Sequence, residues 1–236
     1  MRARASPASA SASVPPHGRK TRGAKRGDLP QRDRWADAVR RHVRSDSWIP
    51  LENPPAVLHD VVVVFSQPKT ASNVGAFARC CAAFECESPL RLVSPVCDVT
   101  SRAALNAAKG AQRLVREACV VDTLDEALVG CSHAVAFHPW GRDDDDEGGL
   151  VNLFDDLDAV VEAFPGGGAD GGKLALVFGN EADGLSKSEL ERCDAICSIP
   201  MGRLVESLSV THAGVIALSR YYERRSASGL ATRQRG

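Results

Sequence analysis

The chain has 236 residues, of which 44% are hydrophobic and 25% charged, and its formal net charge is -1. That length and composition predict one domain with a sizeable core, flanked by tails. The balanced charge excludes a uniformly basic protein of the kind that attracts polyanions over its whole surface. Apolar runs stay shorter than the roughly 18 residues of a membrane-spanning helix, so no membrane partner is expected.

Eight cysteines are scattered along the sequence. None forms a Cys-X-X-Cys pair and no two histidines stand at metal-ligand spacing, so we expect no metal site. Several lie inside apolar periodic runs, where cysteine behaves as a small buried hydrophobic residue. The pattern predicts free thiols in a reducing compartment.

The first 30 residues are low in complexity, and up to residue 26 they carry basic side chains without an acidic one. Two interpretations fit this composition. It slightly favours an organellar transit peptide, for chloroplast or mitochondrion, over a disordered basic arm of a cytoplasmic or nuclear protein. Residues 31–56 are predicted to form a helix, at 32–48, and a linker. The chain beyond Arg220 is basic again, and 226–236 is predicted to be a basic tail.

The domain itself is predicted over residues 57–225, where strand-like and helix-like runs alternate. Apolar β-branched runs predict strands at 61–65, 90–93, 119–121, 134–137, 174–178 and 195–199. Helical periodicity, capping boxes and glycine stops predict helices at 74–85 and 101–110, after Thr123 and Ser186, and along the last stretch from 210. This alternation is typical of an α/β fold, a mostly parallel sheet with helices on both faces.

Residues 141–172 interrupt the alternation with an irregular acidic and glycine-rich insert. Its run Asp143-Asp-Asp-Asp-Glu147 predicts a solvated loop, because four consecutive carboxylates cannot all face one ion. A helix is predicted at 150–164, before the glycine turn at 166–168.

The first polar motif follows the strand at 61–65. Asn73 is predicted to be the N-cap of the next helix, a position for which asparagine is favoured. Gly75 lets the backbone approach a neighbouring segment closely. Arg79 lies off the apolar stripe of this helix. It is either an ordinary surface residue or a functional group. A guanidinium there can make two hydrogen bonds to a phosphate, or can stabilise the deprotonated form of a neighbouring hydroxyl.

The second motif follows the strand at 174–178. Gly179 and Gly184 permit tight turns, and they hold Glu181 between them at the carboxyl end of the strand. Its carboxylate can accept a hydrogen bond from a substrate hydroxyl, orient a neighbouring arginine, or merely cap the following helix.

The third motif links the strand at 195–199 to the last helix. The start of that helix offers unpaired N–H groups and the hydroxyls of Ser207 and Ser209, which serve either a ligand or ordinary N-caps. One face of the helix is flat because it carries small residues, namely Ala213, Gly214 and Ala217. A flat face suits a subunit contact or packing within the chain.

Because the carboxyl ends of parallel strands meet at one edge of a sheet, the three motifs are expected to form one site. The sequence lacks a GxGxxG after the first strand, a GxxxxGK[ST] and a GxSxG, so the common dinucleotide, P-loop and hydrolase sites are excluded. Among the six histidines, His138 stands at the end of the strand at 134–137. A lone histidine there is more often structural than catalytic.

The three motifs resemble those of the SpoU/TrmH branch of the SPOUT RNA 2′-O-ribose methyltransferases, over about residues 61–223. The first motif is matched by Asn73, Gly75 and Arg79. The second is matched by Gly179, Glu181 and Gly184, and the third by Ile199-Pro-Met with Ser207-Leu-Ser209. The segments 107–111 and 120–131 resemble the TrmJ type in particular.

The resemblance implies an α/β domain of the SPOUT type with a trefoil knot at its C-terminal end, and a homodimer through the last helix. It implies S-adenosylmethionine as cofactor and catalytic roles for Arg79, Asn73, Glu181 and Ser209. The cofactor would be held by Ala136, Phe137, His138, Gly179, Ile199, Met201, Ser207 and Leu208. Arg79 would activate the target 2′-hydroxyl, while Asn73 and Glu181 would position Arg79 and the substrate.

The implied function is methylation of a ribose 2′-hydroxyl in tRNA, with rRNA as an alternative, at a cytidine or uridine of the anticodon loop. Arg79, the basic arm and the basic tail would contact phosphates. Ser209 stands where the family usually has asparagine, and Phe137-His138 where it tends to have small hydroxyl residues. A second hypothesis is therefore a catalytically weakened, RNA-binding member of the family. A third is a methyltransferase that acts on a base.

Overall fold

The computed structural model describes residues 56–139, 150–152 and 172–227. Several predictions fall outside these residues: the basic arm at 1–30, the helix at 32–48, the acidic run of the insert and the tail beyond residue 227.

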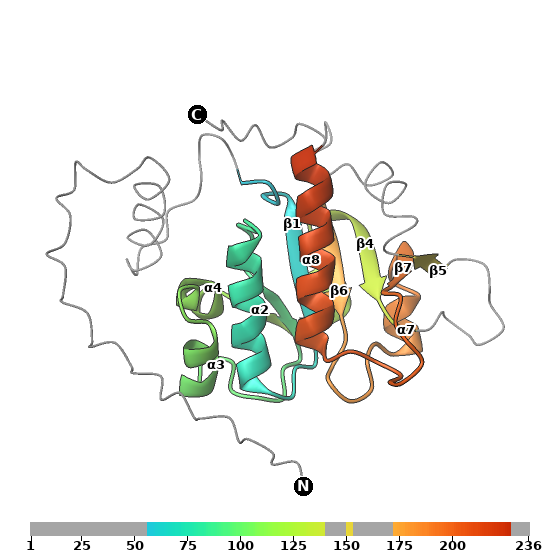
Figure 1. The fold of residues 1–236 in the computed structure, drawn as a ribbon. Coiled ribbons are helices and arrows are strands. Elements are labelled where there is room, and N and C mark those ends of the chain that lie inside the picture. Colours follow the sequence, from blue (N-terminus) through green and yellow to red (C-terminus); the bar gives the residue numbers. More distant parts are fainter. Residues whose placement is uncertain (1–55, 140–149, 153–171, 228–236) are drawn as a thin grey trace, which may run out of the picture. The chain divides into compact units, whose positions relative to one another are not determined.

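A seven-stranded sheet forms the centre of the described residues, and its order is β3-β2-β1-β6-β4-β7-β5. The strands are β1 (Val61–Ser66), β2 (Arg91–Val93), β3 (Cys119–Val121), β4 (Cys131–Phe137), β5 (Leu150–Asn152), β6 (Lys173–Phe178) and β7 (Ala195–Ser198). All six neighbouring pairs are parallel, and Figure 1 shows the strands side by side. The central strand β1 is buried at every position, as its continuous apolar run predicts.

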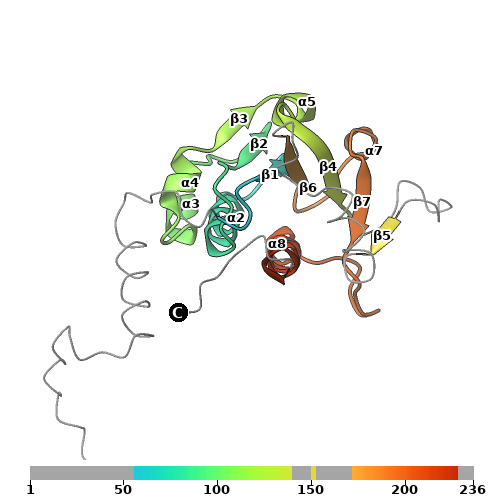
Figure 2. The same ribbon diagram turned by 90° about the horizontal axis from the view of Figure 1, so that it is seen from above.

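Helices cover both faces of the sheet, as Figure 2 shows from above. One face carries α2 (Ala71–Ala83), α3 (Arg102–Ala107), α4 (Gln112–Arg116) and α8 (Val210–Ala227), and the other carries α5 (Leu124–Ala127) and α7 (Lys187–Leu190). Alternate side chains of β1 point to the two layers: Val63 and Phe65 join the core under α2 and α8, whereas Val62 and Val64 join the core under α5 and α7. The predicted α/β fold is confirmed.

Local sequence signals set most of the helix starts. Ser186 and Glu189 form the predicted capping box at α7, each binding the backbone of the other. Thr123 caps α5 by accepting from the Glu126 N–H, but the Glu126 carboxylate accepts from the N–H of Asp122 instead of that of Thr123. This second box is therefore only half formed.

The last helix packs on α2 through its small residues. A Cβ on Gly214 would lie 2.4 Å from a ring carbon of Phe77, so only glycine allows this approach. Ala217, Leu218 and Tyr221 are fully buried on the same stripe. The flat face of α8 is thus used for packing within the chain at Gly214 and Ala217.

Two predictions of local structure are corrected, and one short helix was not predicted. The helix α2 begins at Ala71, three residues earlier than predicted, with Thr70 at the N-cap; Asn73 lies inside its first turn. Residues 150–152 form the edge strand β5, paired with β7, where the predicted helix at 150–164 would begin. The short helix α4 was not predicted, because five residues are too few to show a periodic pattern.

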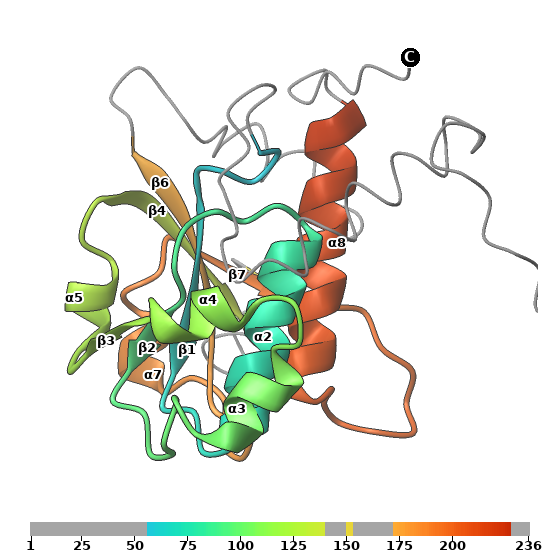
Figure 3. The ribbon, with the colours of Figure 1, turned by 90° about the vertical axis from the view of Figure 1, so that its left-hand side faces the viewer.

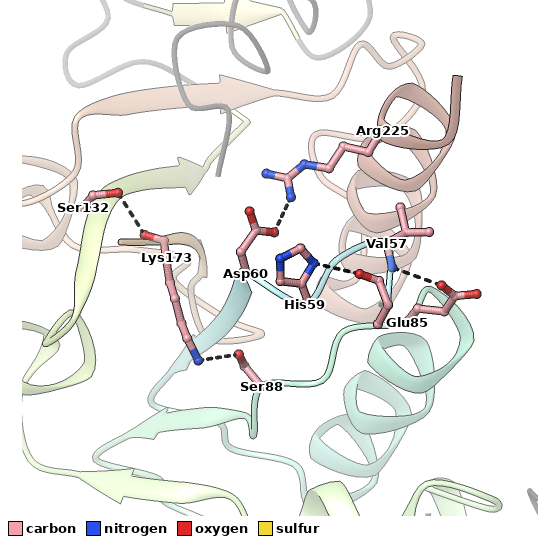
Figure 4. Close-up of polar contacts among 9 residues, drawn as sticks. Val57, His59, Asp60, Glu85, Ser88, Ser132, Lys173 and Arg225 are labelled. Carbon is pink, nitrogen blue, oxygen red and sulfur yellow. Dashed lines mark hydrogen bonds and ion pairs between the residues drawn. The ribbon is translucent and has the colours of Figure 1, made fainter. Parts of the chain in front are cut away.

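The amino end of the sheet is closed by polar contacts that Figure 4 shows. The Arg225 guanidinium, near the C-terminus of α8, donates to the carboxylate of Asp60 just before β1, and both side chains are buried. Beside them Lys173 donates to the Ser88 hydroxyl at 3.0 Å, and a Glu85 oxygen accepts from the Val57 N–H at 3.0 Å. Arg225 is therefore a structural residue in the fold, not part of a free basic tail.

Candidate active site

A cavity opens at the carboxyl end of the sheet, where the loops after β4, β6 and β7 meet the start of α8 (Figure 1, lower end of the sheet). Its empty volume, counting the part open to solvent, is about 790 Å³. The second and third polar motifs of the sequence thus line one cavity, whereas the first motif reaches it only through the contact of Asn73 with Glu181. The lining residues are Phe137, His138, Pro139, Phe178, Gly179, Asn180, Glu181, Ala182, Asp183, Gly184, Cys197, Ile199, Met201, Ser207, Leu208, Val210 and Ala213.

Seven of the eight residues predicted to hold a cofactor line this cavity: Phe137, His138, Gly179, Ile199, Met201, Ser207 and Leu208. The eighth, Ala136, is fully buried inside β4 and does not reach the cavity. Ala136 precedes Phe137 in the strand, so its side chain points to the opposite face. Glu181 and Gly184, which the sequence analysis named in the second motif, also line it; the remaining lining residues were missed as individual side chains, although Asn180, Ala182 and Asp183 lie within that motif.

The loop after β6 is a tight turn that leaves no room for a larger residue at Gly179. A Cβ there would lie 2.1 Å from the carbonyl carbon of Gly184. Asn180 and Gly184 exchange two backbone hydrogen bonds of 3.2 Å. The Asn180 side-chain oxygen accepts from the N–H groups of Ala182 and Asp183, each at 2.8 Å. The turn is therefore fixed before any ligand binds.

Glu181 leaves this turn and caps α2 from outside the helix. Its carboxylate accepts from the N–H of Lys69 at 2.9 Å, from the N–H of Thr70 at 3.0 Å and from the Asn73 amide at 2.8 Å. Burial would raise the pKa of Glu181, but these hydrogen bonds outweigh it and lower the pKa below its ordinary value. Glu181 thus joins the cavity to the helix that carries Asn73.

An ion pair closes the same contact at the surface. Lys69 Nζ lies 2.8 Å from Asp183 Oδ2, and the two side chains are 41% and 75% exposed. The pKa of Asp183 is lowered by the hydrogen bond and the charge of Lys69. Because both groups face water, the pair contributes little to stability.

Arg79 does not join Asn73 and Glu181 in the described chain. It is exposed on α2, six residues beyond Asn73, and is absent from the cavity lining. Six residues advance a helix by about 9 Å. A single copy of the chain therefore carries the cavity and the arginine as separate features.

Ser209 caps the last helix. Its hydroxyl accepts from the N–H of His212 at 3.4 Å and lies 2.7 Å from His212 Nδ1. It is exposed and does not line the cavity, whereas Ser207 does. The contacts of Ser209 are those of the N-cap interpretation.

The cavity has the chemistry of a nucleoside site. The Phe137 and Phe178 rings stack at 4.7 Å in its wall, and Ile199, Met201 and Leu208 add apolar surface. The rim offers the turn at Gly179 and Gly184, where backbone polar groups approach without side chains between them. An apolar slot beside exposed backbone groups fits the adenosine of S-adenosylmethionine. Among the described residues, no group of three metal-ligating side chains was found.

Comparison with known proteins gives two bacterial relatives of the same name. The tRNA (cytidine/uridine-2'-O-)-methyltransferase TrmJ of Yersinia pestis (strain Pestoides F) is 32% identical over 164 residues, which are 66% of this chain and 58% of that protein. TrmJ of Salmonella typhimurium (strain LT2) is 33% identical over 187 residues, 76% of this chain and 69% of that protein. This chain therefore spans less than two thirds of the length of the Yersinia enzyme.

A solved structure agrees with these relatives. The crystal structure of a probable methyltransferase from Bordetella pertussis Tohama I is 28% identical, covers 71% of this chain and 96% of its own, and superposes with a TM-score of 0.63. No helix among the described residues has the length and apolar character that crossing a membrane requires.

The expected organellar location is wrong. The relatives are proteins of Yersinia and Salmonella, and bacteria contain neither chloroplasts nor mitochondria, so the similarity gives no support to organellar import. A basic, acid-free stretch rich in serine and alanine is a weak signal, because composition alone does not distinguish a transit peptide from other basic arms.

The SpoU rRNA Methylase family model matches residues 60–219, which include all three motifs and the cavity. The resemblance predicted from the motifs is confirmed: the chain belongs to the SpoU methylase family.

Proposed function

We propose that the protein transfers a methyl group from S-adenosylmethionine to a ribose 2′-hydroxyl of tRNA, at a cytidine or uridine of the anticodon loop. The observation that carries the proposal is the cavity that the second and third motifs build at the carboxyl end of the sheet, where Glu181 of its lining also binds Asn73 of the first motif. The names of the Yersinia and Salmonella relatives support the substrate class and the position of transfer. rRNA is the alternative substrate, because the family model bears that name.

S-adenosylmethionine is the proposed ligand of the cavity, and when bound it supplies the electrophilic methyl group. The stacked rings of Phe137 and Phe178 and the side chains of Met201 and Leu208 would enclose it and exclude water. The turn at Gly179 and Gly184 would present backbone groups to its polar edge. We also propose that the chain from β6 to α8 forms a trefoil knot around this site.

Arg79 is the proposed catalytic residue for the hydroxyl. A guanidinium stays protonated at any working pH, so it would stabilise the alkoxide that forms as the proton leaves. Because Arg79 is exposed and outside the cavity of its own chain, we propose that it serves the cavity of a second copy in a homodimer formed through α8. Asn73 and Glu181 would position it by fixing the first turn of α2.

A mixture of two inactive variants tests this arrangement. Arg79→Ala would lack the guanidinium and Gly179→Val would lack a usable cavity. If Arg79 acts across a two-fold dimer, subunit exchange should restore about one quarter of wild-type activity, because half of the dimers are mixed and each has one complete site. Recovery of no activity, with sedimentation showing mixed dimers, would mean that Arg79 acts within its own chain or not at all.

The reaction itself is tested by transfer of a labelled methyl group to unmodified tRNA, followed by nuclease digestion and mass analysis of the nucleosides. The proposal predicts label on the ribose of a cytidine or uridine, in a linkage that resists 2′-hydroxyl-dependent cleavage. Label on a base would instead favour the third hypothesis, a base methyltransferase.

A second function is favoured by one residue. Ser209 stands where the family has asparagine, and its hydroxyl accepts a hydrogen bond as the N-cap of α8. This is expected for a member that binds RNA without catalysis. Calorimetry separates the two functions. Tight binding of S-adenosylmethionine supports the enzyme, whereas intact tRNA affinity without cofactor binding supports the binding protein. We also propose that residues 57–225 form the methyltransferase domain, that 141–172 is an insert within it, and that the basic arm at 1–30 and the tail at 226–236 lie outside it.

A further inference from the structure

A group of basic side chains lies on α3, on α4 and in the turn between them, outside the cavity. Residues 101–117 carry four basic side chains and one acidic one, a formal charge of +3. Arg102, Lys109 and Arg116 are exposed, while Arg113 is half-exposed and pairs with Glu117 at 2.6 Å. We call Arg102, Lys109, Arg113 and Arg116 the α3–α4 basic surface. None of its members was assigned a role by the three motifs.

The opposite face of the sheet carries the opposite charge. Residues 122–126, around α5, hold three acidic side chains and no basic one, and residues 186–194, which include α7, hold three acidic and two basic. One of these basic residues, Arg192, is paired with Asp125 at 3.1 Å. Because the whole chain has a net charge of -1, the basic surface is a local feature and not part of a general excess. A polyanion would therefore be attracted to the α3–α4 side and repelled from the α5–α7 side.

The basic surface is held rigidly to the helix that carries Arg79. Figure 3 shows α3 and α4 beside α2, on the same face of the sheet. A Cβ on Gly75 would lie 2.0 Å from the carbonyl oxygen of Ala104, so the α2 and α3 backbones nearly touch. Ala104, Ala108, Leu114 and Val115 are buried under the two short helices. The position of the surface relative to Arg79 is thus fixed by packing.

We infer that the α3–α4 basic surface binds the sugar-phosphate backbone of a folded RNA while its target nucleotide is presented beside α2. This inference rests on the proposed function for the identity of the RNA. Lysine and arginine side chains on short helices reach phosphates without reading bases, so the surface would add affinity and orientation but no sequence preference. The acidic face would keep the same RNA from docking on the other side of the sheet.

Two matched double variants test the inference. The double variant Lys109→Gln with Arg116→Gln removes two positive charges from the basic surface. The control, Lys187→Gln with Arg192→Gln, removes two positive charges from the α5–α7 side. Equilibrium binding of unmodified tRNA to the full chain is measured over a series of salt concentrations. The first variant should bind about tenfold more weakly, and the slope of log affinity against log salt should fall by about 1 to 2. The second should bind like the wild type.

Controls separate this inference from the proposed function. Both variants should keep the melting temperature and the affinity for S-adenosylmethionine, because the substituted residues are exposed and are not among the residues that line the cavity. Wild-type tRNA affinity in the first variant, with methyl transfer intact, would overturn the inference alone. Weakened tRNA binding without methyl transfer by the wild-type protein would support the surface and contradict the enzyme. A loss of binding to phosphatidylserine vesicles with unchanged tRNA affinity would also overturn it, in favour of a lipid surface.

Discussion

The two ends of the sheet differ in how deeply their paired charged side chains are buried. At the amino end, Asp60 and Arg225 are paired with side chains only 6% and 2% exposed. At the carboxyl end, Lys69 and Asp183 are paired at 41% and 75% exposure. A buried pair loses much stability when it is broken, whereas an exposed pair loses little. The buried ion pair thus lies at the amino end of the sheet, and the carboxyl end keeps its charged groups near water, where a ligand can bind.

The carboxyl end is ordered by turns and caps instead of by burial. Gly179 allows a backbone contact that no other residue permits, and the Glu181 carboxylate caps a helix of another segment. Such contacts fix geometry while leaving polar groups near water, where a ligand can meet them. Variants at the two ends should therefore separate stability from binding.

The largest effect is expected from Asp60→Ala. It leaves the Arg225 guanidinium buried without its carboxylate, so the free energy of unfolding should fall by about 3 to 5 kcal/mol. Denaturant unfolding measures this loss. The control, Lys69→Ala, should change the same quantity by less than about 1 kcal/mol. Equal losses in the two variants would remove the distinction between the ends.

Gly179→Val should weaken the binding of S-adenosylmethionine. Its side chain would overlap the backbone at Gly184 and push the turn into the cavity, so affinity for S-adenosylmethionine should fall by about ten- to a hundredfold. The control is Gly202→Ala in the loop after β7, where a Cβ meets nothing within 4 Å. That variant should bind the cofactor like the wild type in calorimetry. Undiminished binding by Gly179→Val would place the cofactor elsewhere.

Glu181→Gln should give a smaller effect that depends on pH. The carboxylate pKa is lowered in the folded state, so its contribution is fully present above the ordinary carboxyl pKa and is lost as pH falls through the lowered value. At neutral pH the variant should be about 1 kcal/mol less stable, the usual cost of a weakened cap. Melting curves should show this difference constant from pH 8 to 6 and shrinking below about pH 4. A difference that grows on acidification would contradict the capping role.

The smallest effect is expected from Ser209→Ala, which removes an exposed cap and should cost about 0.5 kcal/mol. Ser209→Asn keeps a capping side chain and should match the wild type in thermal melts. Methyl transfer gives the readout that stability does not. A fall in kcat for the alanine variant alone would support the catalytic role, whereas equal kcat in all three proteins would leave Ser209 as a cap.

Sequence reasoning located the loops of the site well. The strands around it are buried apolar runs, and each ends in a glycine or proline turn, so the convergence of Gly179, Ile199 and Ser207 follows from strand order alone. The sequence did not predict features that depend on contacts between distant segments. Asn73 was predicted to cap α2, but the N-cap is Thr70, and the Asn73 amide instead donates to Glu181, more than a hundred residues away.

The same limit applies to charge. Arg225 follows a basic pattern at the end of the chain, and nothing local shows that Asp60 lies beside it in the core. Conversely, the basic residues from Arg102 to Arg116 are divided between two short helices and the turn that joins them, so no single helical period shows them as one group. Ala136 was included among cofactor residues although the alternation of a strand turns it away from Phe137.

Amide hydrogen exchange with and without S-adenosylmethionine tests the central claim most directly. Binding in the cavity should slow exchange at 137–139, 179–184 and 199–208, and should leave 57–60 and the end of α8 around Arg225 unchanged. Slowed exchange confined to the amino end, or binding that protects none of the three loops, would contradict the account.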